Sequence, residues 1–163
     1  MIEYRAVTKS DLPIICSFAG SEEELFFFYP KGEYPLNPEQ LQKAIEQRSD
    51  STVMLCDGVV AGFANFYHWA NGVCCIGNVV VAPAMRARGL ASQLIRTMIG
   101  IAVHRHAATR IEISCFSQNA AGLLLYTSLG FEPFGIEERK SPDGTRTALI
   151  NMCYKVERKP TLD

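Results

Sequence analysis

VVVAPAMRARGLAS, at residues 79–92, joins an apolar strand to an amphipathic helix through a short arginine-glycine loop. Apolar side chains then recur with the spacing of one helical face, at Leu90, Leu94, Ile95, Met98, Ile101 and Ala102. The first N–H groups of a helix have no intrahelical partner and the helix dipole is positive there, so the loop favours an anion. Gly89 leaves room for a phosphate beside the backbone, and Arg86 and Arg88 add positive charge. The stretch therefore predicts a diphosphate-binding loop.

The order of these residues is a more specific signal than the presence of an arginine-glycine loop alone. V-x-P is followed by R-x-x-G-x-A and an uninterrupted helix, which resembles the Q/R-x-x-G-x-G/A signature of the GCN5-related N-acetyltransferase (GNAT) family. The match consists of Arg86, Gly89 and Ala91, with alanine in place of the commoner second glycine. In that family the loop binds the pyrophosphate of acetyl-CoA, so the resemblance implies acetyl-CoA as co-substrate. Taken alone, the stretch also fits an ordinary connection with two solvated arginines.

A second block, NAAGLLLYTSLGF at residues 119–131, follows in the family's order. Gly130 is placed to end a helix, and Asn119 and Tyr126 are seven residues apart, so both project from one helical face. The block resembles N-x-x-A-x-x-L-Y-x-x-x-G-F of the same family, with Gly122 where alanine is usual. The resemblance implies that Asn119 contacts the pantetheine arm and that Tyr126 protonates the leaving thiolate. Individually, Asn119 also fits a helix N-cap, and Tyr126 a core tyrosine with a backbone partner.

The resemblance also implies a fold and a cofactor site. It predicts an α+β fold of the GNAT acyl-CoA N-acyltransferase type, with a mixed central sheet of about seven strands and flanking helices. In relatives the fourth and fifth strands diverge and the pantetheine arm enters the gap; the fourth strand here ends at Val81. The implied cofactor-binding residues are Val79, Val81, Arg86, Ala87, Arg88, Gly89, Leu90, Ala91, Ser92, Asn119 and Tyr126.

The pattern along the chain predicts strands and helices in the same order. Strands are expected at 2–7, 53–56, 59–69, up to 81, at 111–116, 131–140 and 145–156, with Asp57-Gly58 and Asn71-Gly72 as hairpin turns. Helices are expected at 12–18, 37–48, from 90 and at 119–129. Residues 20–37 form the least regular segment. We expect one domain at residues 1–157 and a C-terminal tail at 158–163.

Composition narrows the class of protein. The 163 residues are 48% hydrophobic and 20% charged, which is typical of a globular chain with its own core. The net charge of −1 argues against nonspecific nucleic-acid binding. The N-terminus does not resemble a signal peptide, and no apolar run reaches membrane-spanning length. Six cysteines without CxxC spacing predict reduced, buried thiols and no metal site. We therefore expect a cytoplasmic protein without a membrane partner.

The residue that accepts the proton of the attacking amine is open. Some relatives that modify protein N-termini carry a glutamate late in the fifth strand, where this chain has Ser114. The candidate bases are His68, Glu33, the run Glu22-Glu23-Glu24, or water held by backbone carbonyls.

The segment before the second helix bears on the acceptor. The run Phe26-Phe27-Phe28-Tyr29-Pro30 fits either a core plug or a wall of the acceptor pocket, with at least half of it in the core. The three glutamates before it would attract a cationic amine with an apolar or extended body, or form a solvated acidic loop without a role.

These observations together predict an N-acetyltransferase in which an amine attacks acetyl-CoA directly within a ternary complex. The acceptor is expected to be a small-molecule or peptide amine, and a homodimer is left open. The alternatives are a non-catalytic acyl-CoA-binding sensor, which the presence of Tyr126 disfavours, and an interaction module, which the near-neutral charge disfavours.

Overall fold

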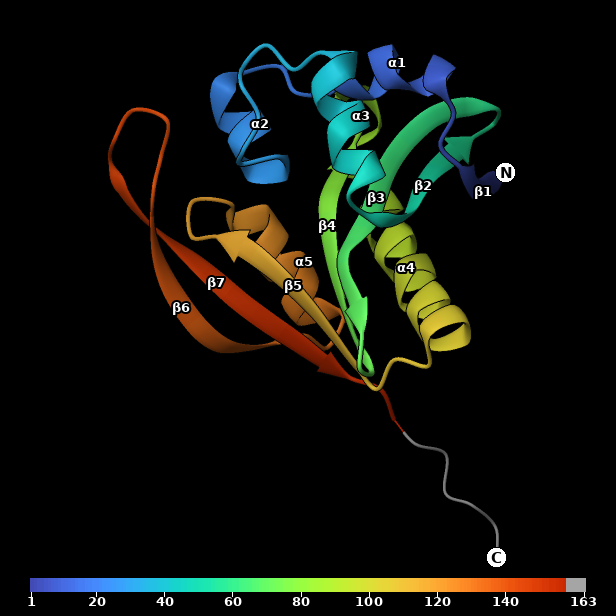
Figure 1. Cartoon of the computed structure of the whole chain (residues 1–163), viewed down its shortest axis with the longest axis vertical. Helices are drawn as coiled ribbons and strands as arrows, with labels where there is room; N and C mark the ends of the chain where they lie inside the picture. Colours follow the sequence, from blue (N-terminus) through green and yellow to red (C-terminus); the bar gives the residue numbers. More distant parts are fainter. Residues whose placement is uncertain (158–163) are drawn as a thin grey trace, which may run out of the picture.

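The computed structural model describes residues 1–157, so the expected tail at 158–163 lies outside the described part. A seven-stranded mixed sheet runs through the chain in the order β1-β2-β3-β4-β5-β7-β6 (Figure 1). Its strands are β1 (Ile2–Ala6), β2 (Ser49–Cys56), β3 (Val59–Ala70), β4 (Val73–Val81), β5 (Arg110–Phe116), β6 (Glu132–Lys140) and β7 (Arg146–Lys155). Only the β4–β5 pair is parallel; its neighbours pair antiparallel. The expected mixed sheet of about seven strands is confirmed.

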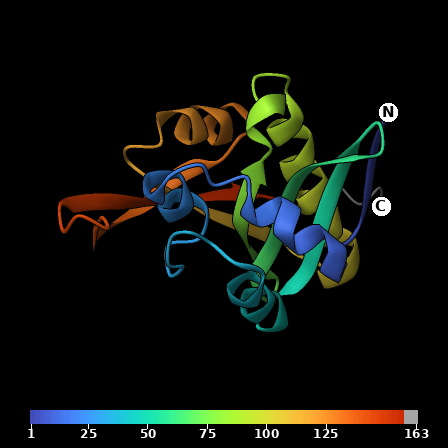
Figure 2. The same cartoon turned by 90° about the horizontal axis from the view of Figure 1, so that it is seen from above.

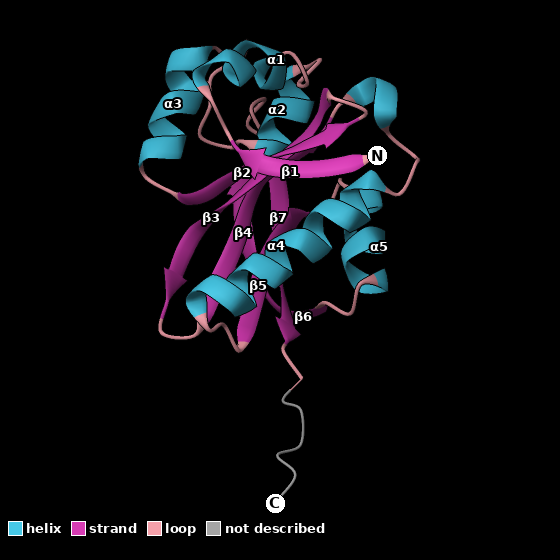
Figure 3. Cartoon of the chain, turned by 90° about the vertical axis from the view of Figure 1, so that its right-hand side faces the viewer, coloured by secondary structure: helices cyan, strands magenta, loops and turns pink. Residues whose placement is uncertain are grey.

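Helices cover both faces of the sheet. On one face lie α1 (Leu12–Cys16), α2 (Glu22–Phe28) and α3 (Pro38–Glu46); on the other lie α4 (Leu90–His106) and α5 (Ala120–Ser128) (Figures 2 and 3). Short 3₁₀ turns precede α1 and α4, at Lys9–Asp11 and Pro83–Met85. The β6–β7 hairpin projects beyond the helices toward the side of α2 (Figure 1). The fold is α+β, as expected.

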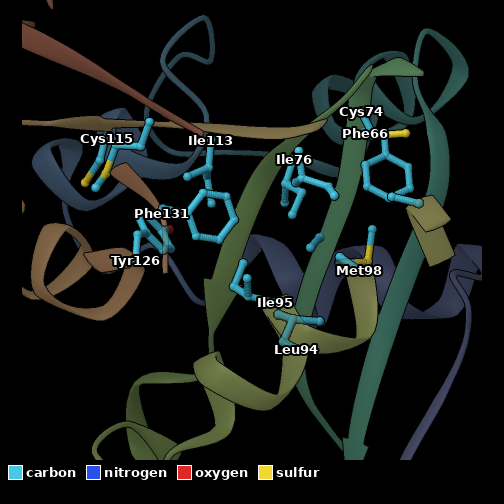
Figure 4. Close-up of a cluster of buried hydrophobic side chains, with 14 of the residues drawn as sticks. Phe66, Cys74, Ile76, Leu94, Ile95, Met98, Ile113, Cys115, Tyr126 and Phe131 are labelled. Atoms are coloured by element: carbon cyan, nitrogen blue, oxygen red, sulfur yellow. The ribbon is translucent and has the colours of Figure 1, made fainter. Parts of the chain in front are cut away.

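Each face of the sheet carries its own hydrophobic core. Between the sheet and α4 and α5, Leu94, Ile95 and Met98 pack among strand residues such as Ile76 and Ile113 (Figure 4). These positions belong to the predicted apolar face of the helix that starts at Leu90; within that face, Ile101 is only partly buried. Beneath α1 to α3 a second cluster gathers around Phe63, Leu25 and Leu41. The 3.6-residue period thus predicted the buried face of α4.

Within residues 20–37, which were expected to be the least regular segment and for which no helix was predicted, the structure forms the helix α2. Ser21 is the N-cap, because its Oγ accepts a hydrogen bond from the Glu24 N–H at 3.1 Å. The Glu24 carboxylate in turn accepts from the Gly20 N–H at 2.6 Å. The Ser21 cap satisfies one free N–H group of the helix, Glu24 ties the preceding residue Gly20 to it, and Leu25 and Phe28 are buried. A seven-residue helix therefore forms where Gly20 and the acidic run suggested a loop.

Three expected helices end earlier than predicted, at Cys16, Glu46 and Ser128. At each end the next N–H reaches back in a tighter turn, as from Ser17 to Ile14 and from Leu129 to Tyr126. Such 3₁₀-type bonds occupy the last carbonyls, and the chain then leaves the helix. All six cysteines are free thiols, five of them buried and Cys56 partly so. None of the helices in residues 1–157 is both long and apolar enough to span a membrane.

Candidate active site

The site begins where β4 and β5 separate. The two strands pair only from Val73 to Ile76 on β4, against Arg110 to Ile113 on β5. Beyond these residues they diverge, as Figure 1 shows. Asn78 has a φ of +50°, which bends β4 just after the last pair. The β4 backbone beyond Ile76 is therefore left with hydrogen-bonding groups that no β5 residue occupies.

A cavity of about 530 Å³ lies along this opening. We call it the first cavity. It is lined by residues of α2, the end of β4, the loop with the start of α4, and α5. The lining residues are Glu24, Phe27, Phe28, Val79, Val80, Val81, Met85, Arg86, Ala87, Gly89, Leu90, Ala91, Ser92, Asn119, Ala121, Gly122, Leu125 and Tyr126. The structure thus brings together the predicted cofactor-binding residues, with the exception of Arg88, which is exposed and does not line the cavity.

The arginine-glycine loop has the backbone geometry of an anion site. Gly89 is the N-cap of α4 with a φ of +74°, and Ala87 is also left-handed, at +62°. Open space surrounds the position that a Gly89 side chain would occupy. The first N–H groups of α4 therefore face a region that a phosphate can reach. The glycine is needed both for its positive φ and for this access.

Arg86 departs from the expectation of a guanidinium waiting for phosphate. Its NH1 donates to Glu24 Oε1 at 2.9 Å, and its Nε donates to the Val81 carbonyl at 3.3 Å. The hydrogen bond from Arg86 holds the pKa of Glu24 below its usual value, which favours the carboxylate form of Glu24. Both side chains are partly exposed. The pair therefore joins α2 to the loop across 62 residues of sequence.

Asn119 caps α5. Its Oδ1 accepts a hydrogen bond from the Gly122 N–H at 3.1 Å, so Asn119 is the helix N-cap that the sequence allowed. The residue also lines the first cavity, so the two readings coexist. The geometry explains Gly122 as well. A Cβ there would lie 2.8 Å from Asn119 Nδ2 and 2.9 Å from Cys115 Sγ. Alanine, the usual residue of the family, would need Asn119 or Cys115 to move.

Tyr126 is buried, and its ring packs edge-on against Phe131 at a centroid distance of 6.1 Å. Burial raises the pKa of Tyr126, so the phenol stays protonated over the physiological range. Among residues 1–157 the structure gives its hydroxyl no hydrogen-bond partner. Every fully enclosed polar side-chain atom in these residues has a partner, so this hydroxyl is not fully enclosed, and Tyr126 lines the first cavity. The interpretation of Tyr126 as a core tyrosine required a backbone group bonded to its hydroxyl, and no described residue supplies one. A residue with a neutral phenol therefore lines the first cavity.

The two single-residue base candidates lie elsewhere. His68 is exposed on β3 opposite Cys75, in the half of β4 that still pairs with β5, and its Nε2 lies 3.2 Å from the Ala70 carbonyl. Glu33 follows α2 and lines a separate cavity of about 350 Å³. Among the described residues, the lining of the first cavity includes neither side chain. The structure does not bring His68 or Glu33 beside Tyr126.

A second cavity, of about 340 Å³, opens between α2 and the β6–β7 loop. Its lining residues are Glu22, Glu23, Phe26, Phe27, Gln118, Ser141, Pro142, Asp143 and Thr145. Three of these are carboxylates. The Thr145 N–H donates to Asp143 at 2.9 Å, which holds the pKa of that carboxyl below its usual value. Gln118 and the hairpin residues were not predicted, because no local pattern indicates that the hairpin reaches α2.

Comparison with known proteins places these features in a family. The model of the acetyltransferase (GNAT) family matches residues 18–131. A candidate phosphinothricin N-acetyltransferase is 20% identical with a TM-score of 0.80, over 97% of this chain and 100% of its own. The ribosomal-protein-S18-alanine N-acetyltransferase of Escherichia coli is 21% identical with a TM-score of 0.76, over 100% and 99%. The candidate acetyltransferase yncA of Salmonella typhimurium, solved with acetyl-CoA, is 20% identical with a TM-score of 0.73, over 100% and 98%. These likenesses show the fold.

Proposed function

This chain belongs to the GNAT family of acetyltransferases, and from that premise we propose that it transfers the acetyl group of acetyl-CoA to a primary amine. The observation that carries the proposal is the continuity of the first cavity from the Gly89 loop, along the unpaired end of β4, to Tyr126. Those three parts suit a diphosphate, a chain of amides and a thiol, in that order. The amine enters from the second cavity, which adjoins the first at Phe27.

The chain's own residues supply binding and orientation. The N–H groups at the start of α4 bind the diphosphate, and the free β4 backbone near Val79 and Val81 pairs with the pantetheine amides. Asn119 lies in the same cavity, with its Oδ1 engaged in the cap and its amide nitrogen left to donate. Acetyl-CoA supplies the acetyl group as a reactive thioester. Holding both substrates in one cleft replaces a bimolecular encounter by an oriented reaction.

The transfer forms a bond from the amine nitrogen to the acetyl carbon and breaks the carbon–sulfur bond. Tyr126 protonates the departing sulfur, because its phenol is neutral and lines the cavity. The amine loses its proton to a carboxylate or a water in the second cavity, where Glu22, Glu23 and Asp143 lie. This assignment favours the acidic run over His68 as proton acceptor.

The acceptor is a cationic amine with an apolar or extended body. The second cavity combines three carboxylates with the rings of Phe26 and Phe27, and its described lining contains no lysine or arginine. Such a surface attracts cations and disfavours anions. The test is release of free thiol from acetyl-CoA with a panel of amino acids, polyamines, aminoglycosides and peptides. Turnover with amines that carry a second positive charge is expected; acetyl-CoA binding without turnover on any amine would indicate a sensor instead.

We expect Glu22→Gln/Glu23→Gln to raise the acceptor KM about tenfold at low ionic strength, with the acetyl-CoA KM unchanged. Both side chains line the second cavity and not the first. Glu24 is left intact because its carboxylate pairs with Arg86. Steady-state kinetics with the amine found in the screen measures the effect.

The matched control is Glu39→Gln/Glu46→Gln, which removes the same charge from exposed positions of α3. It should leave both KM values unchanged. Equal values of the acceptor KM and of kcat in the two double variants would show that Glu22 and Glu23 are solvated surface charges without a role in the reaction.

A further inference from the structure

Phe27 stands between the two cavities. Among the described residues that line them, it is the one common to both. Its neighbours on α2 divide between the two sides: Phe28 lines the first cavity and Phe26 the second. A side chain at this point borders the cleft on one side and the carboxylate-lined space on the other. Whether a group bound in the first cavity can extend past Phe27 therefore depends on how firmly the surrounding contacts hold its side chain.

The helix that carries Phe27 is tied to the cleft at both ends. Near its start, Glu24 is bound to Arg86 at 2.9 Å. At its end, the Phe28 carbonyl accepts a hydrogen bond from the buried Asn78 Nδ2 at 3.0 Å. Asn78 is the residue at which β4 bends, and its Oδ1 is bound by Asn65 at 3.0 Å. The position of α2 is thus fixed against the loop and the bend of β4.

Aromatic packing also holds the face of α2 that carries Phe26 and Phe27. Phe116 ends β5, and its ring stacks on Phe26 at a centroid distance of 4.2 Å and on Phe27 at 6.4 Å. The helix is therefore bonded to β4 through Asn78 and packed on β5 through Phe116. It bridges the two strands on the side where they have diverged, and Figure 1 shows α2 beyond their separating ends. Phe27 lies on this helix and lines both cavities.

We propose that Phe27 is a specificity-determining residue that limits the acyl group to acetyl by closing the far end of the gap between β4 and β5. The inference rests on the proposed use of acetyl-CoA. A longer acyl chain that extends through the gap meets the Phe27 ring, which the anchored helix carries and which stacks on Phe116. Removing the ring joins the first cavity to the second and gives such a chain space.

Binding of acetyl-CoA and butyryl-CoA, measured by isothermal titration calorimetry, tests this without an acceptor. The wild-type protein is expected to bind acetyl-CoA at least about tenfold more tightly. Phe27→Ala is expected to reduce that preference about tenfold, mainly through tighter butyryl-CoA binding. Phe134→Ala removes the same side chain from an exposed position on β6 and should keep the wild-type preference.

The outcomes separate this inference from the proposed function. If the wild-type protein binds neither acyl-CoA, the proposed function is wrong. If it binds acetyl-CoA, but Phe27→Ala keeps the wild-type preference, or the wild type shows no preference, then Phe27 does not limit the acyl group. Should Phe27→Ala fail to fold, Phe27→Leu gives the same readout with a smaller expected change, about threefold. An unchanged preference there overturns the inference equally.

Discussion

Gly89→Glu is expected to weaken acetyl-CoA binding by at least about a hundredfold, the largest effect on affinity that we predict. The new carboxylate would enter the open space beside Gly89, at the positive end of α4, and would occupy and repel the position of the diphosphate. A side chain at a φ of +74° adds backbone strain of about 1 kcal/mol or more. Calorimetric titration of the purified variant with acetyl-CoA measures the loss.

A control variant introduces the same backbone strain and the same charge away from the proposed cofactor site. Gly58, in the turn between β2 and β3, has a φ of +82° and equally open surroundings. Gly58→Glu therefore introduces the same residue into the same backbone conformation without touching the first cavity. It should bind acetyl-CoA as the wild type does. Wild-type affinity in a folded Gly89→Glu would refute the assignment of the loop to the cofactor.

The loop was predictable because its signal is local. Gly89 ends a strand–loop segment and begins a helix within a few residues, and the φ that it needs is one that glycine supplies. Asn119 and Tyr126 were selected by the resemblance to the family motif, and their spacing of seven residues on one helix places both on one face, where both line the first cavity. The order of strands and helices followed from periodicity and turn residues. Local sequence signals, together with the family resemblance, thus predicted which residues of α4 and α5 line the first cavity.

The other half depends on contacts between distant segments. Arg86 meets Glu24 across 62 residues, and Phe27 meets Phe116 only because α2 packs over the divergence of β4 and β5. The bend at Asn78 lies where that divergence begins, and a single buried asparagine in an apolar strand is a weak signal for it. A signal for α2 was present, since Ser21 followed three residues later by Glu24 is a capping-box pattern. The preceding glycine and the acidic run concealed it.

The two candidate bases, His68 and Glu33, show what the sequence cannot predict, which is the position of a side chain relative to the reacting atoms. His68 and Glu33 were selected for their chemical type, because the sequence does not place either one relative to Tyr126. The register of β3 against β4 sets His68 opposite Cys75, and Glu33 follows α2 beside a different cavity. Residue type is a property of the sequence, whereas proximity to the reacting atoms is a property of the sheet register and of the helix packing.

Tyr126→Phe is expected to lower kcat by about a hundredfold or more while acetyl-CoA affinity stays nearly unchanged. Phenylalanine keeps the ring contact with Phe131 and removes only the hydroxyl of Tyr126, a residue that lines the cavity. That hydroxyl matters as the thiolate develops, since a buried neutral phenol can donate its proton to the sulfur. Steady-state kinetics with the amine found in the screen gives kcat, and calorimetry gives the affinity.

Tyr154 offers the control on the same aromatic cluster. Its ring packs against Phe131 with centroids 5.6 Å apart, yet it does not line the first cavity. Tyr154→Phe therefore makes the same chemical change beside the same neighbour, and kcat should stay at the wild-type value. Because slow product release would hide a chemical step, single-turnover measurements accompany both variants. A Tyr126→Phe protein whose single-turnover rate equals that of Tyr154→Phe would show that Tyr126 serves packing, and the proton for the leaving sulfur would then have to come from water.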